Sequence, residues 1–489
     1  MIVDDTALIF EKSRPGRKTG LLPETDGAPL EKLIPAKYLR KTPPRFPEVA
    51  ELEVVRHYTR LSQKSFSIDT NFYPLGSCTM KYNPKINEKI ASMPGFARLH
   101  PHQPDSEVQG ALQLMFDLQG YLAEISGMDA VTLQPAAGAQ GELTGILLIK
   151  AYLAEKGQAQ RTEVLIPDSA HGTNPATCTL AGFKAVSVKS NARGGVDLED
   201  LKKKLGDKTA ALMITNPSTL GLFEDQIVTI AKLMHDAGAQ VYMDGANMNA
   251  IQGITRPGDF GVDVMHFNLH KTFSTPHGGG GPGSGPVACK KHLEPYLPVP
   301  RVVKRGDAYA LDSDRPKSIG RVKAFFGNFG MHVRCYAYIR THGPEGLRRN
   351  AENAVLNANY LKSLVSGRFK IAFDRPCMHE FVIDGSPLRK LGIQTFDVAK
   401  RLLDYGFHPP TIYFPLIVRD CLMIEPTESE NRETLDQFAA VLIKILDEAK
   451  TDPDMVHHAP HTMPVGRLDE LKAAREPIVR YIPKAEVKS

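Results

Sequence analysis

Cysteine is scarce in this chain of 489 residues, and its six cysteines are widely scattered. None of them forms a C-x-x-C pair, so we expect neither a zinc site nor a disulfide framework. The sequence therefore predicts no metal site. A reducing cytoplasm is the simplest compartment for such a chain.

Long apolar runs are missing as well. No stretch approaches the roughly 18 uninterrupted apolar residues that a membrane-spanning helix needs, so we expect no membrane span. The start, residues 1–5, is acidic and lacks the basic and apolar regions of a signal peptide. The formal net charge of +5 is small for this length and gives little reason to expect nucleic acid as a partner.

Two common phosphate-binding motifs are absent from residues 134–142, where small residues open a predicted helix. This segment has neither the G-x-G-x-x-G spacing of dinucleotide-binding folds nor the G-x-x-x-x-G-K-[ST] spacing of P-loop proteins. A dinucleotide-dependent or P-loop enzyme is therefore not indicated.

Short apolar strands alternate with helical stretches through the middle of the chain. Apolar runs predict strands at 162–166, 210–215, 240–244 and 262–267, and helical spacing predicts helices at 107–125 and 225–237. Such βα units indicate an α/β fold with a mostly parallel sheet. Ligands of these sheets bind beyond the carboxyl ends of the strands, which is where the polar motifs of this sequence lie.

Three parts are predicted along the chain. Residues 1–100 form an N-terminal arm and partner-binding segment, residues 101–330 the large domain, and residues 331–489 a smaller α+β domain. The first 50 residues are rich in Pro, Lys, Arg and Gly and read as an extended arm that needs a partner surface. The small domain follows a long helix near 333–339, has strands near 370–373, 380–383 and 421–424 and helices near 395–405 and 432–449, and ends in a polar, Pro-rich tail.

Lys271 is the most informative residue. It closes an apolar, strand-like segment and enters a loop with four consecutive glycines, Gly278–Gly281, flanked by Pro276 and Pro282. A lone lysine in such a loop is usually solvated. The apolar flank favours a partly desolvated amine, which is a usable nucleophile.

Two further polar residues follow strands. Asp244, in Met243–Asn247 (MDGAN), ends an apolar strand; it caps a turn, or it holds the protonated ring nitrogen of pyridoxal 5′-phosphate (PLP). Ala246 beside it is small enough for a flat ring to lie against the backbone. His171, in Ser169–Ala176 (SAHGTNPA), is either structural or stacked on the cofactor ring.

Small residues open a predicted helix in Gln134–Glu142 (QPAAGAQGE), before an apolar helical run at 143–152. Exposed N–H groups and the helix dipole favour an anion there, so a phosphate fits. Thr215–Gly221 (TNPSTLG) is a turn after another strand and a candidate pocket segment. Taken together, a phosphate loop, a stacking histidine, an aspartate and a lysine give each part of one cofactor a partner.

These motifs resemble those of the P-protein family of the glycine cleavage system, in its two-subunit form. The resemblance runs from about residue 35 to 475. It is carried by Asn71–Pro84 (NFYPLGSCTMKYNP), Asn268–Phe273 (NLHKTF) with its glycine loop, and Pro426–Glu430 (PTESE), together with the Gln134–Glu142, Ser169–Ala176 and Met243–Asn247 motifs.

The resemblance implies the aspartate aminotransferase-like fold, PLP-dependent fold type I, and roles for single residues. Lys271 carries PLP as a Schiff base, Asp244 partners the pyridine nitrogen, and His171 stacks on the ring. Ala137, Gly138 and Ala139 offer N–H groups to the phosphate, with Ala246 and His270 beside the cofactor. In one departure, Ala136-Ala137 stands where single-chain relatives have Asn-Ser, so the backbone must supply a contact that a hydroxyl makes there.

The resemblance also implies the reaction and the partners. Glycine loses CO2, and the aminomethyl group passes to the lipoyl arm of a small carrier, the H-protein. A second subunit of similar fold without the lysine completes the site, in a heterotetramer with two copies of each chain, and the N-terminal arm clasps it. Tyr73, Ser77 and Cys78 lie in a loop expected to border glycine and the lipoyl entrance.

Two alternatives stay open at this point. Another fold-type-I decarboxylase or an aminotransferase is compatible with the motifs, and Arg375 or Arg419 is then a candidate for binding a substrate carboxylate. A non-catalytic subunit that only completes a neighbour's pocket is the other alternative. The presence of both Lys271 and Asp244 argues against it, because a scaffold needs neither.

Overall fold

The computed structural model describes residues 7–20, 27–42, 44–278 and 283–482. The chain divides into two compact units. One comprises residues 68–462, and the other comprises the described residues up to Ser67 and from Met463 onward. The predicted boundaries at residues 100 and 330 stay predictions.

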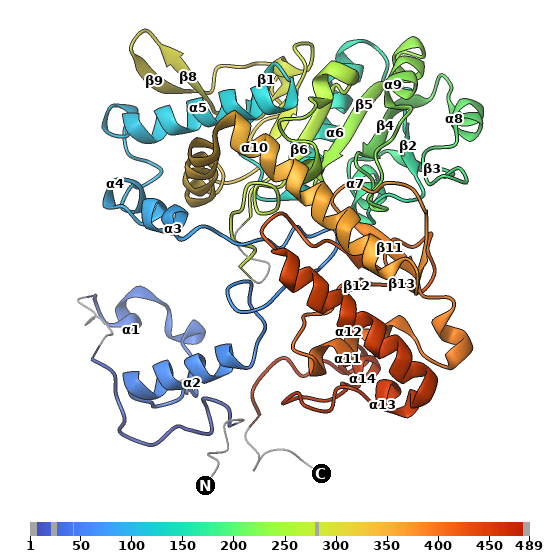
Figure 1. Ribbon diagram of the computed structural model, residues 1–489. Coiled ribbons are helices and arrows are strands. Elements are labelled where there is room, and N and C mark those ends of the chain that lie inside the picture. The colour runs from blue at the N-terminus through green and yellow to red at the C-terminus, as the bar shows by residue number, and fades with distance from the viewer. Residues whose placement is uncertain (1–6, 21–26, 43, 279–282, 483–489) are drawn as a thin grey trace. The chain divides into compact units, whose positions relative to one another are not determined.

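A seven-stranded sheet forms the centre of the larger unit, in the order β1-β7-β6-β5-β4-β2-β3 (Figure 1). Strand β7 runs antiparallel to both of its neighbours, and every other pair is parallel. The strands are β1 (Ala130–Thr132), β2 (Glu163–Pro167), β3 (Lys184–Val188), β4 (Thr209–Thr215), β5 (Gln240–Gly245), β6 (Val264–Phe267) and β7 (Val287–Cys289).

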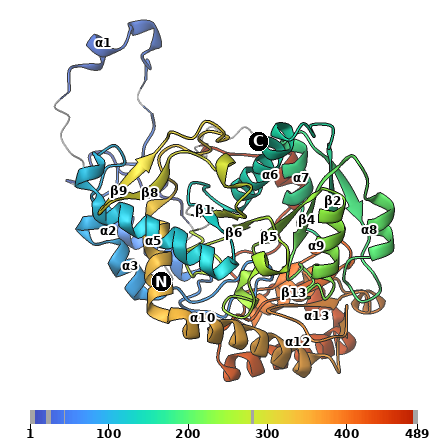
Figure 2. The same ribbon diagram turned by 90° about the horizontal axis from the view of Figure 1, so that it is seen from above.

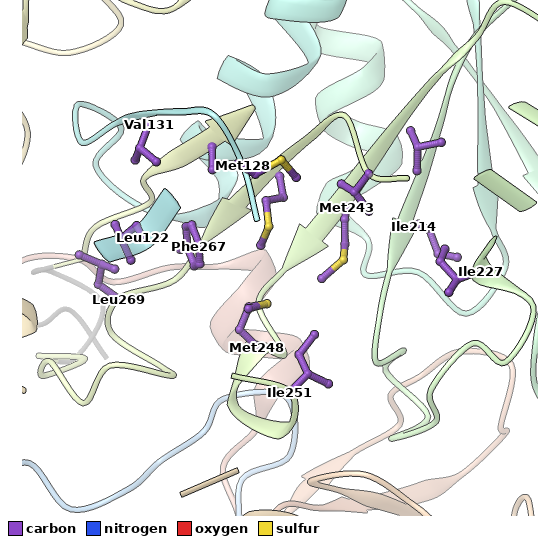
Figure 3. Packing of buried hydrophobic residues seen from close by; sticks show 14 of the residues in the cluster. Leu122, Met128, Val131, Ile214, Ile227, Met243, Met248, Ile251, Phe267 and Leu269 are labelled. Atoms are coloured by element: carbon purple, nitrogen blue, oxygen red, sulfur yellow. The ribbon is translucent and has the colours of Figure 1, made fainter. Parts of the chain in front are cut away.

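The central strands are apolar because both faces of the sheet are covered. Along β4, Leu212 and Ile214 join the core on one face, whereas Ala211 and Met213 join the core on the other. Figure 3 shows the first core, where Met243 of β5 lies between Ile214 of β4, which is beside Ile227, and Phe267 of β6, which is beside Leu122. Near-continuous apolar runs are the expected pattern for parallel strands buried on both faces.

Helices cover the two faces of this sheet (Figure 2). On one side lie α6 (Gly138–Glu155) and α7 (Thr173–Leu180), whose buried side chains belong to one core. On the other side lie α5 (Gln109–Ser126), α9 (Ile227–Asp236) and the first half of α10 (Phe329–Val365), which belong to the second core. The arrangement is a three-layer α/β domain.

A four-stranded antiparallel sheet with order β10-β11-β13-β12 forms a smaller layer in the same unit. Its strands are β10 (Lys370–Ile371), β11 (Phe381–Asp384), β12 (Thr411–Ile412) and β13 (Cys421–Ile424). Helices α11 (Thr395–Asp404) and α12 (Arg432–Thr451) pack on it around a separate apolar core. The long helix α10 reaches from the large sheet to this core and bends at Gly343, whose φ is 61°.

Shorter elements complete the larger unit. They are α3 (Lys85–Ala91), α4 (Pro94–Ala97), α8 (Leu198–Lys204), α13 (Pro453–His457), the hairpin of β8 (Arg301–Arg305) and β9 (Ala308–Asp312), and the 3-10 helices η2 (Asp105–Glu107), η3 (Met248–Ala250), η4 (Pro257–Phe260), η5 (Glu294–Tyr296) and η6 (Leu388–Leu391).

The smaller unit has few elements. It contains α1 (Leu30–Leu33), η1 (Ala36–Tyr38), α2 (Glu51–Gln63) and α14 (Glu470–Arg475). Lys12 Nζ lies 3.0 Å from His57 Nδ1, and the rings of Phe10 and Tyr481 stack with centroids 4.5 Å apart. Apart from such contacts its side chains are largely exposed, as expected for an arm without a core of its own.

The structure confirms the predicted α/β fold with a mostly parallel sheet, and it corrects two local predictions. Strand β6 ends at Phe267, so Lys271 lies four residues beyond the strand, in a turn, and does not close the strand. The region after Thr451 is not only a polar tail, because it contains α13 and α14. Among the described residues, no helix combines the length and apolar character needed to cross a membrane.

Candidate active site

A cavity opens at the carboxyl ends of β4, β5 and β6. Nine of the residues singled out in the sequence line it, together with two threonines of the Thr215–Gly221 segment. The lining residues are Ser77, Ala137, Gly138, Ala139, Glu142, His171, Thr173, Thr215, Thr219, Asp244, Ala246, Asn247, His266, Asn268, His270 and Lys271. The motifs therefore meet at the edge of the sheet where ligands of α/β folds bind.

Helix α6 begins at the wall of this cavity without a side-chain cap. Its N-cap residue is Ala137, whose side chain has no polar atom, and Gly138 and Ala139 follow it. The first N–H groups of a helix have no partner within the helix, and the helix dipole adds positive potential. This end of α6 is therefore suited to an anion such as a phosphate.

Glycines on one face of α6 let it lie unusually close to the sheet. A Cβ on Gly141 would stand 2.9 Å from the Cβ of His266, and a Cβ on Gly145 would stand 2.4 Å from the ring of Tyr242. Both distances are too short for real atoms. The glycines thus bring the start of α6, and with it Glu142, against the ends of β5 and β6.

Asp244 is a buried, ionised carboxylate at the end of β5. Its Oδ1 accepts a hydrogen bond from the Ala246 N–H at 2.9 Å, and its Oδ2 accepts one from the Asn174 amide at 3.1 Å. Burial alone would raise the pKa of Asp244, but His266 and these two donors lower it below its ordinary value. Asp244 therefore stays charged and can hold a cationic group of a ligand.

A neutral histidine stands behind Asp244. The Tyr242 hydroxyl lies 2.6 Å from His266 Nδ1, and His266 Nε2 lies 3.3 Å from Asp244 Oδ1. Burial raises the pKa of Tyr242 far above its ordinary value and lowers that of His266, so the tyrosine keeps its proton and the imidazole is neutral. Tyr242 then donates to Nδ1, which leaves the imidazole proton on Nε2, facing Asp244.

Glu142 is the second buried carboxyl at this wall. The hydroxyl of Thr173 lies 2.7 Å from its Oε1, and the hydroxyl of Thr177 donates to its Oε2 at 3.2 Å. Burial, and then the charge of Asp244, raise the pKa of Glu142 to about 7. One side-chain oxygen or nitrogen atom from each of Glu142, Asp244 and His266 lies within 4.8 Å of the other two. One proton in this cluster therefore responds to pH near neutrality.

His171 lies at the mouth of the cavity, between β2 and α7. Its Nδ1 accepts the Thr173 N–H at 3.2 Å, and the Phe414 ring stands edge-on to it with centroids 5.3 Å apart. Burial lowers the pKa of His171, and the charge of Lys271 lowers it further, so the ring is neutral at physiological pH. A neutral ring held at both its edge and its nitrogen is suited to stacking on a flat ligand.

Lys271 follows β6 in a turn, where its N–H donates to the Asn268 carbonyl at 3.0 Å. Beside it, His270 Nδ1 lies 3.4 Å from the Ser284 N–H, and its ring stands edge-on to His277. Burial, with the charge of Lys271, lowers the pKa of His270 to about 3 and that of His277 to about 4. Gly279–Pro282 of the predicted glycine loop lie outside the described residues.

Only one of the three residues of the predicted substrate loop lines the cavity. Ser77 lines the cavity, whereas Tyr73 and Cys78 are not among its lining residues. The Tyr73 ring stacks on His408 with centroids 3.6 Å apart. Burial raises the pKa of the Cys78 thiol to about 11, although the nearby charge of Lys271 opposes this shift. Cys78 therefore lies within electrostatic reach of Lys271, just behind the wall.

The two arginines considered for an aminotransferase do not line the cavity. Arg375 donates to the Phe223 carbonyl at 2.9 Å and pairs with Asp225 at 3.1 Å, and Arg419 is exposed. No observation therefore favours the aminotransferase alternative.

Sequence reasoning gave no role to several residues of this site. Glu142 stood within a quoted motif, and His266 within a predicted strand, but neither was assigned a function. A polar residue inside an apolar strand, as in Val264–Phe267, was the available signal for His266. For Tyr242 and Asn174 the sequence carried no such signal, because their partners are remote in the chain.

Comparison with known proteins decides the family. The family model described as glycine cleavage system P-protein matches residues 26–313, and that described as glycine dehydrogenase, C-terminal domain, matches residues 350–461. The chain belongs to the glycine cleavage system P-protein family. It is 61% identical to the probable glycine dehydrogenase (decarboxylating) subunit 2 of Halalkalibacterium halodurans. The match covers 98% of this chain and 99% of that protein. The chain is 58% identical, over 98% of its length, to the whole of the protein of the same name from Caldanaerobacter subterraneus subsp. tengcongensis.

Solved structures agree on the fold of this P-protein family member. An inhibitor-bound glycine decarboxylase (P-protein) matches 85% of the chain and 95% of its own chain with a TM-score of 0.73 at 24% identity. The cysteine desulfurase CsdA from Escherichia coli matches 81% of the chain and 98% of its own with a TM-score of 0.59 at 14% identity. The predictions of fold type I and of PLP as the cofactor are confirmed. The roles of single residues stay predictions.

Proposed function

We propose that this chain is the PLP-bearing subunit of a two-subunit P-protein. In this proposal it decarboxylates glycine and transfers the remaining aminomethyl group to the lipoyl arm of an H-protein. The observation that carries the proposal is the single cavity lined by Lys271, by Asp244 and by the uncapped start of α6. Family membership and names of relatives at up to 61% identity support glycine as the substrate.

The cavity fits the cofactor at each of its ends. The N–H groups of Gly138 and Ala139 bind the phosphate, and the small Ala246 leaves room for a flat ring. Asp244, ionised and buried, holds the protonated ring nitrogen, and Lys271 is the covalent attachment point for the aldehyde carbon. When bound, PLP supplies a cationic conjugated ring that accepts the electron pair left by departing CO2.

The residues behind Asp244 keep it suited to this task. His266 presents its Nε2 proton to Asp244 Oδ1 because Tyr242 donates to Nδ1. That contact favours the charged carboxylate, and the Asn174 amide and the Ala246 N–H complete its hydrogen bonds. Asp244 is therefore oriented before any ligand binds, which avoids reorganisation during the reaction.

The partners of the chain follow from the same proposal. Relatives named subunit 2 indicate a second subunit, which we propose to be of similar fold, to lack the lysine, and to form a heterotetramer with two copies of each chain. The N-terminal arm, whose side chains are largely exposed, supplies a surface for it. The lipoylated H-protein accepts the aminomethyl group. Tyr73, Ser77 and Cys78 border the entrance through which its lipoyl arm reaches the active site. A cytoplasmic location remains part of the proposal.

The proposal is tested by carboxyl exchange between glycine and 14CO2. The purified chain is assayed with its partner subunit, with and without lipoylated H-protein, and with alanine and serine as competing substrates. We expect exchange with glycine that is stimulated by the lipoylated carrier and abolished in Lys271→Ala. Exchange that prefers a larger amino acid, or that survives in Lys271→Ala, contradicts the proposal.

A further inference from the structure

Two glutamates lie side by side at one end of the small sheet. Phe381 of β11 pairs with Ile424 of β13 in the antiparallel ladder. Glu380 immediately precedes Phe381, and Glu425 immediately follows Ile424, so the two lie opposite each other one step further on. Both are fully buried, as is the neighbouring His379. Two carboxyl groups thus share one buried corner of the larger unit.

The backbone of the Ser77–Thr79 loop binds to both carboxyls. The Ser77 N–H donates to Glu380 Oε2 at 2.6 Å, and the Thr79 N–H donates to Glu425 Oε2 at 2.8 Å. Ser77 and Thr79 both have left-handed backbone angles, with φ of 63° and 48°. Such residues are strained and need fixed partners to hold them. The two carboxyls provide them, and Cys78 lies between the two clamped residues.

The remaining oxygen of each carboxyl, Oε1 of Glu380 and of Glu425, makes no hydrogen bond in the described part of the chain, and neither does either ring nitrogen of His379. His379 Nε2 lies 3.6 Å from Glu380 Oε1. One donor atom from each of these three residues lies within 4.8 Å of the others. Two ionised carboxylates this close in a buried site repel each other strongly, so one of them keeps a proton.

We propose that Glu380 and Glu425 share one proton at neutral pH and act as positioning residues that hold the Ser77–Thr79 loop at the wall of the active site. The inference rests on the proposed function in one respect only, that the cavity lined by Ser77 and Lys271 is the active site. The shared proton removes the repulsion between the carboxyls, and each carboxyl keeps one oxygen for a loop N–H.

The charges around the pair agree with a proton and not with a bound cation. Burial, and then the charge of Glu425, raise the pKa of Glu380 well above its ordinary value, and burial raises the pKa of Glu425 to about 7. Burial and the charge of Lys271 lower the pKa of His379 to about 3, so it is neutral. Lys271 already supplies positive charge nearby. The titratable groups that act on the pair or on the loop between are Lys271, Cys78, His379, Glu428, Tyr73 and His277.

Hydrogen exchange of the loop amides tests the proposal in the cofactor-loaded enzyme without substrate. Mass spectrometry follows a peptide that spans residues 72–82 between pH 7.0 and 8.5, and rates are corrected for the intrinsic pH dependence of amide exchange. Opening the loop admits water, and the carboxyl then releases its proton. In the unchanged enzyme we therefore expect protection to fall about tenfold per pH unit.

Three variants separate charge from hydrogen bonding. Glu380→Gln keeps an oxygen acceptor without a titrating proton, so its loop should stay protected and lose the pH dependence. Glu380→Ala removes the acceptor, and its loop should exchange at least about tenfold faster at every pH, since a lost hydrogen bond to a charged or strongly polar group is worth that much. Glu430→Gln is the matched control: burial raises the pKa of Glu430 to about 7, and no contact joins it to the loop among the described residues, so it should behave like the unchanged enzyme.

Several outcomes overturn the proposal. Protection that is independent of pH in the unchanged enzyme means that no proton is shared. A Glu380→Gln loop as unprotected as that of Glu380→Ala means that the pair is merely structural packing. A stoichiometric metal ion that elemental analysis finds in the unchanged enzyme and not in Glu380→Gln assigns the corner to a cation. None of these results depends on glycine turnover, so they leave the proposed function to its own test.

Discussion

At the scale of single residues, the position of one imidazole proton governs the candidate active site. The Tyr242 hydroxyl and Asp244 lie on opposite sides of His266, and only a tyrosine that donates to Nδ1 leaves the imidazole proton facing Asp244. The Asp244 carboxylate then faces the polarised N–H of His266 across 3.3 Å, and it also accepts hydrogen bonds from Asn174 and the Ala246 N–H.

Removal of this hydroxyl should weaken cofactor binding. In Tyr242→Phe, His266 Nδ1 loses its donor, so the tautomer that faces Asp244 is no longer favoured. The loss of one buried hydrogen bond costs about 1–1.5 kcal/mol, which corresponds to about a tenfold higher Kd for PLP. Titration of the cofactor by absorbance measures this value. Tyr296→Phe is the control, because Tyr296 is also a largely buried tyrosine but interacts with Glu155; an equal loss in both variants would contradict this role of Tyr242.

Glu142 gives a prediction about stability and pH. Its pKa is raised to about 7 in the folded chain by burial and by Asp244, against 4.5 for an ordinary glutamate. The folded state thus binds a proton that the unfolded chain releases between these two values, so stability falls as pH rises from 4.5 to 7. The loss is about 3 kcal/mol for a shift of this size.

The variant Glu142→Gln should remove this dependence. Its Tm should fall less than that of the unchanged chain between pH 5 and pH 7.5, as measured by calorimetry at matched ionic strength. Parallel Tm curves for the two proteins would show that Glu142 is ionised throughout this range.

At the scale of elements, the start of α6 lines the cavity and the helix packs closely on the sheet. Gly141 and Gly145 lie on the helix face that meets His266 and Tyr242, and side chains there would overlap with the sheet. Glycine normally destabilises the interior of a helix, but at these two positions only glycine allows α6 to pack so closely on the sheet.

Alanine substitution should have opposite effects on stability at a helical glycine that packs on the sheet and at one with open space around it. Gly145→Ala places a Cβ 2.4 Å from the Tyr242 ring and should destabilise the chain by about 1–3 kcal/mol. Gly120→Ala in α5 meets nothing within 4 Å and should stabilise the chain by about 0.5–1 kcal/mol. Chemical denaturation measures both values, and a neutral Gly145→Ala would contradict the close approach of α6 to β5.

The sequence predicts the elements of the large domain well because their signals are local. The apolar runs at 210–215 and 240–244 correspond to β4 and β5, and the helical spacing at 107–125 corresponds to α5. Motifs that follow strands were correctly expected at one edge of the sheet. Signals that depend on remote partners were missed: Glu142 receives its role from Asp244, and Glu380 from Glu425 and the Ser77 N–H. The sequence predicts Lys271 at a strand end because an apolar strand precedes it, although residues 269–271 form a turn.

At the scale of the larger unit, Lys81 links four segments that are distant in the sequence. Its buried Nζ donates to the Thr272 carbonyl at 2.5 Å and to Asn249 Oδ1 at 2.8 Å, and it pairs with Glu428 Oε1 at 2.6 Å. The Tyr338 hydroxyl of α10 lies 3.3 Å away. Thr272 directly follows Lys271, so this contact also fixes the turn that carries Lys271.

Loss of the Lys81 contacts should lower the free energy of unfolding far more than loss of an exposed ion pair. Lys81→Met leaves the buried Glu428 without its cation and should destabilise the chain by about 3–5 kcal/mol. The double variant Lys81→Met with Glu428→Gln should recover part of this loss, because no unpaired charge remains. Lys232→Met breaks an exposed pair with Asp236 and should change stability by less than about 0.5 kcal/mol. Similar values for Lys81→Met and Lys232→Met in urea denaturation would contradict the role of Lys81.

The central claim is that Lys271 is the residue to which PLP is attached. The most direct measurement is reduction of the cofactor-loaded chain with sodium borohydride, which fixes the cofactor to its lysine, followed by proteolysis and mass spectrometry. We expect one modified lysine per chain, Lys271, and no cofactor adduct in Lys271→Ala. Attachment to a different lysine, or a chain that carries no reducible cofactor in the presence of its partner subunit, would contradict it.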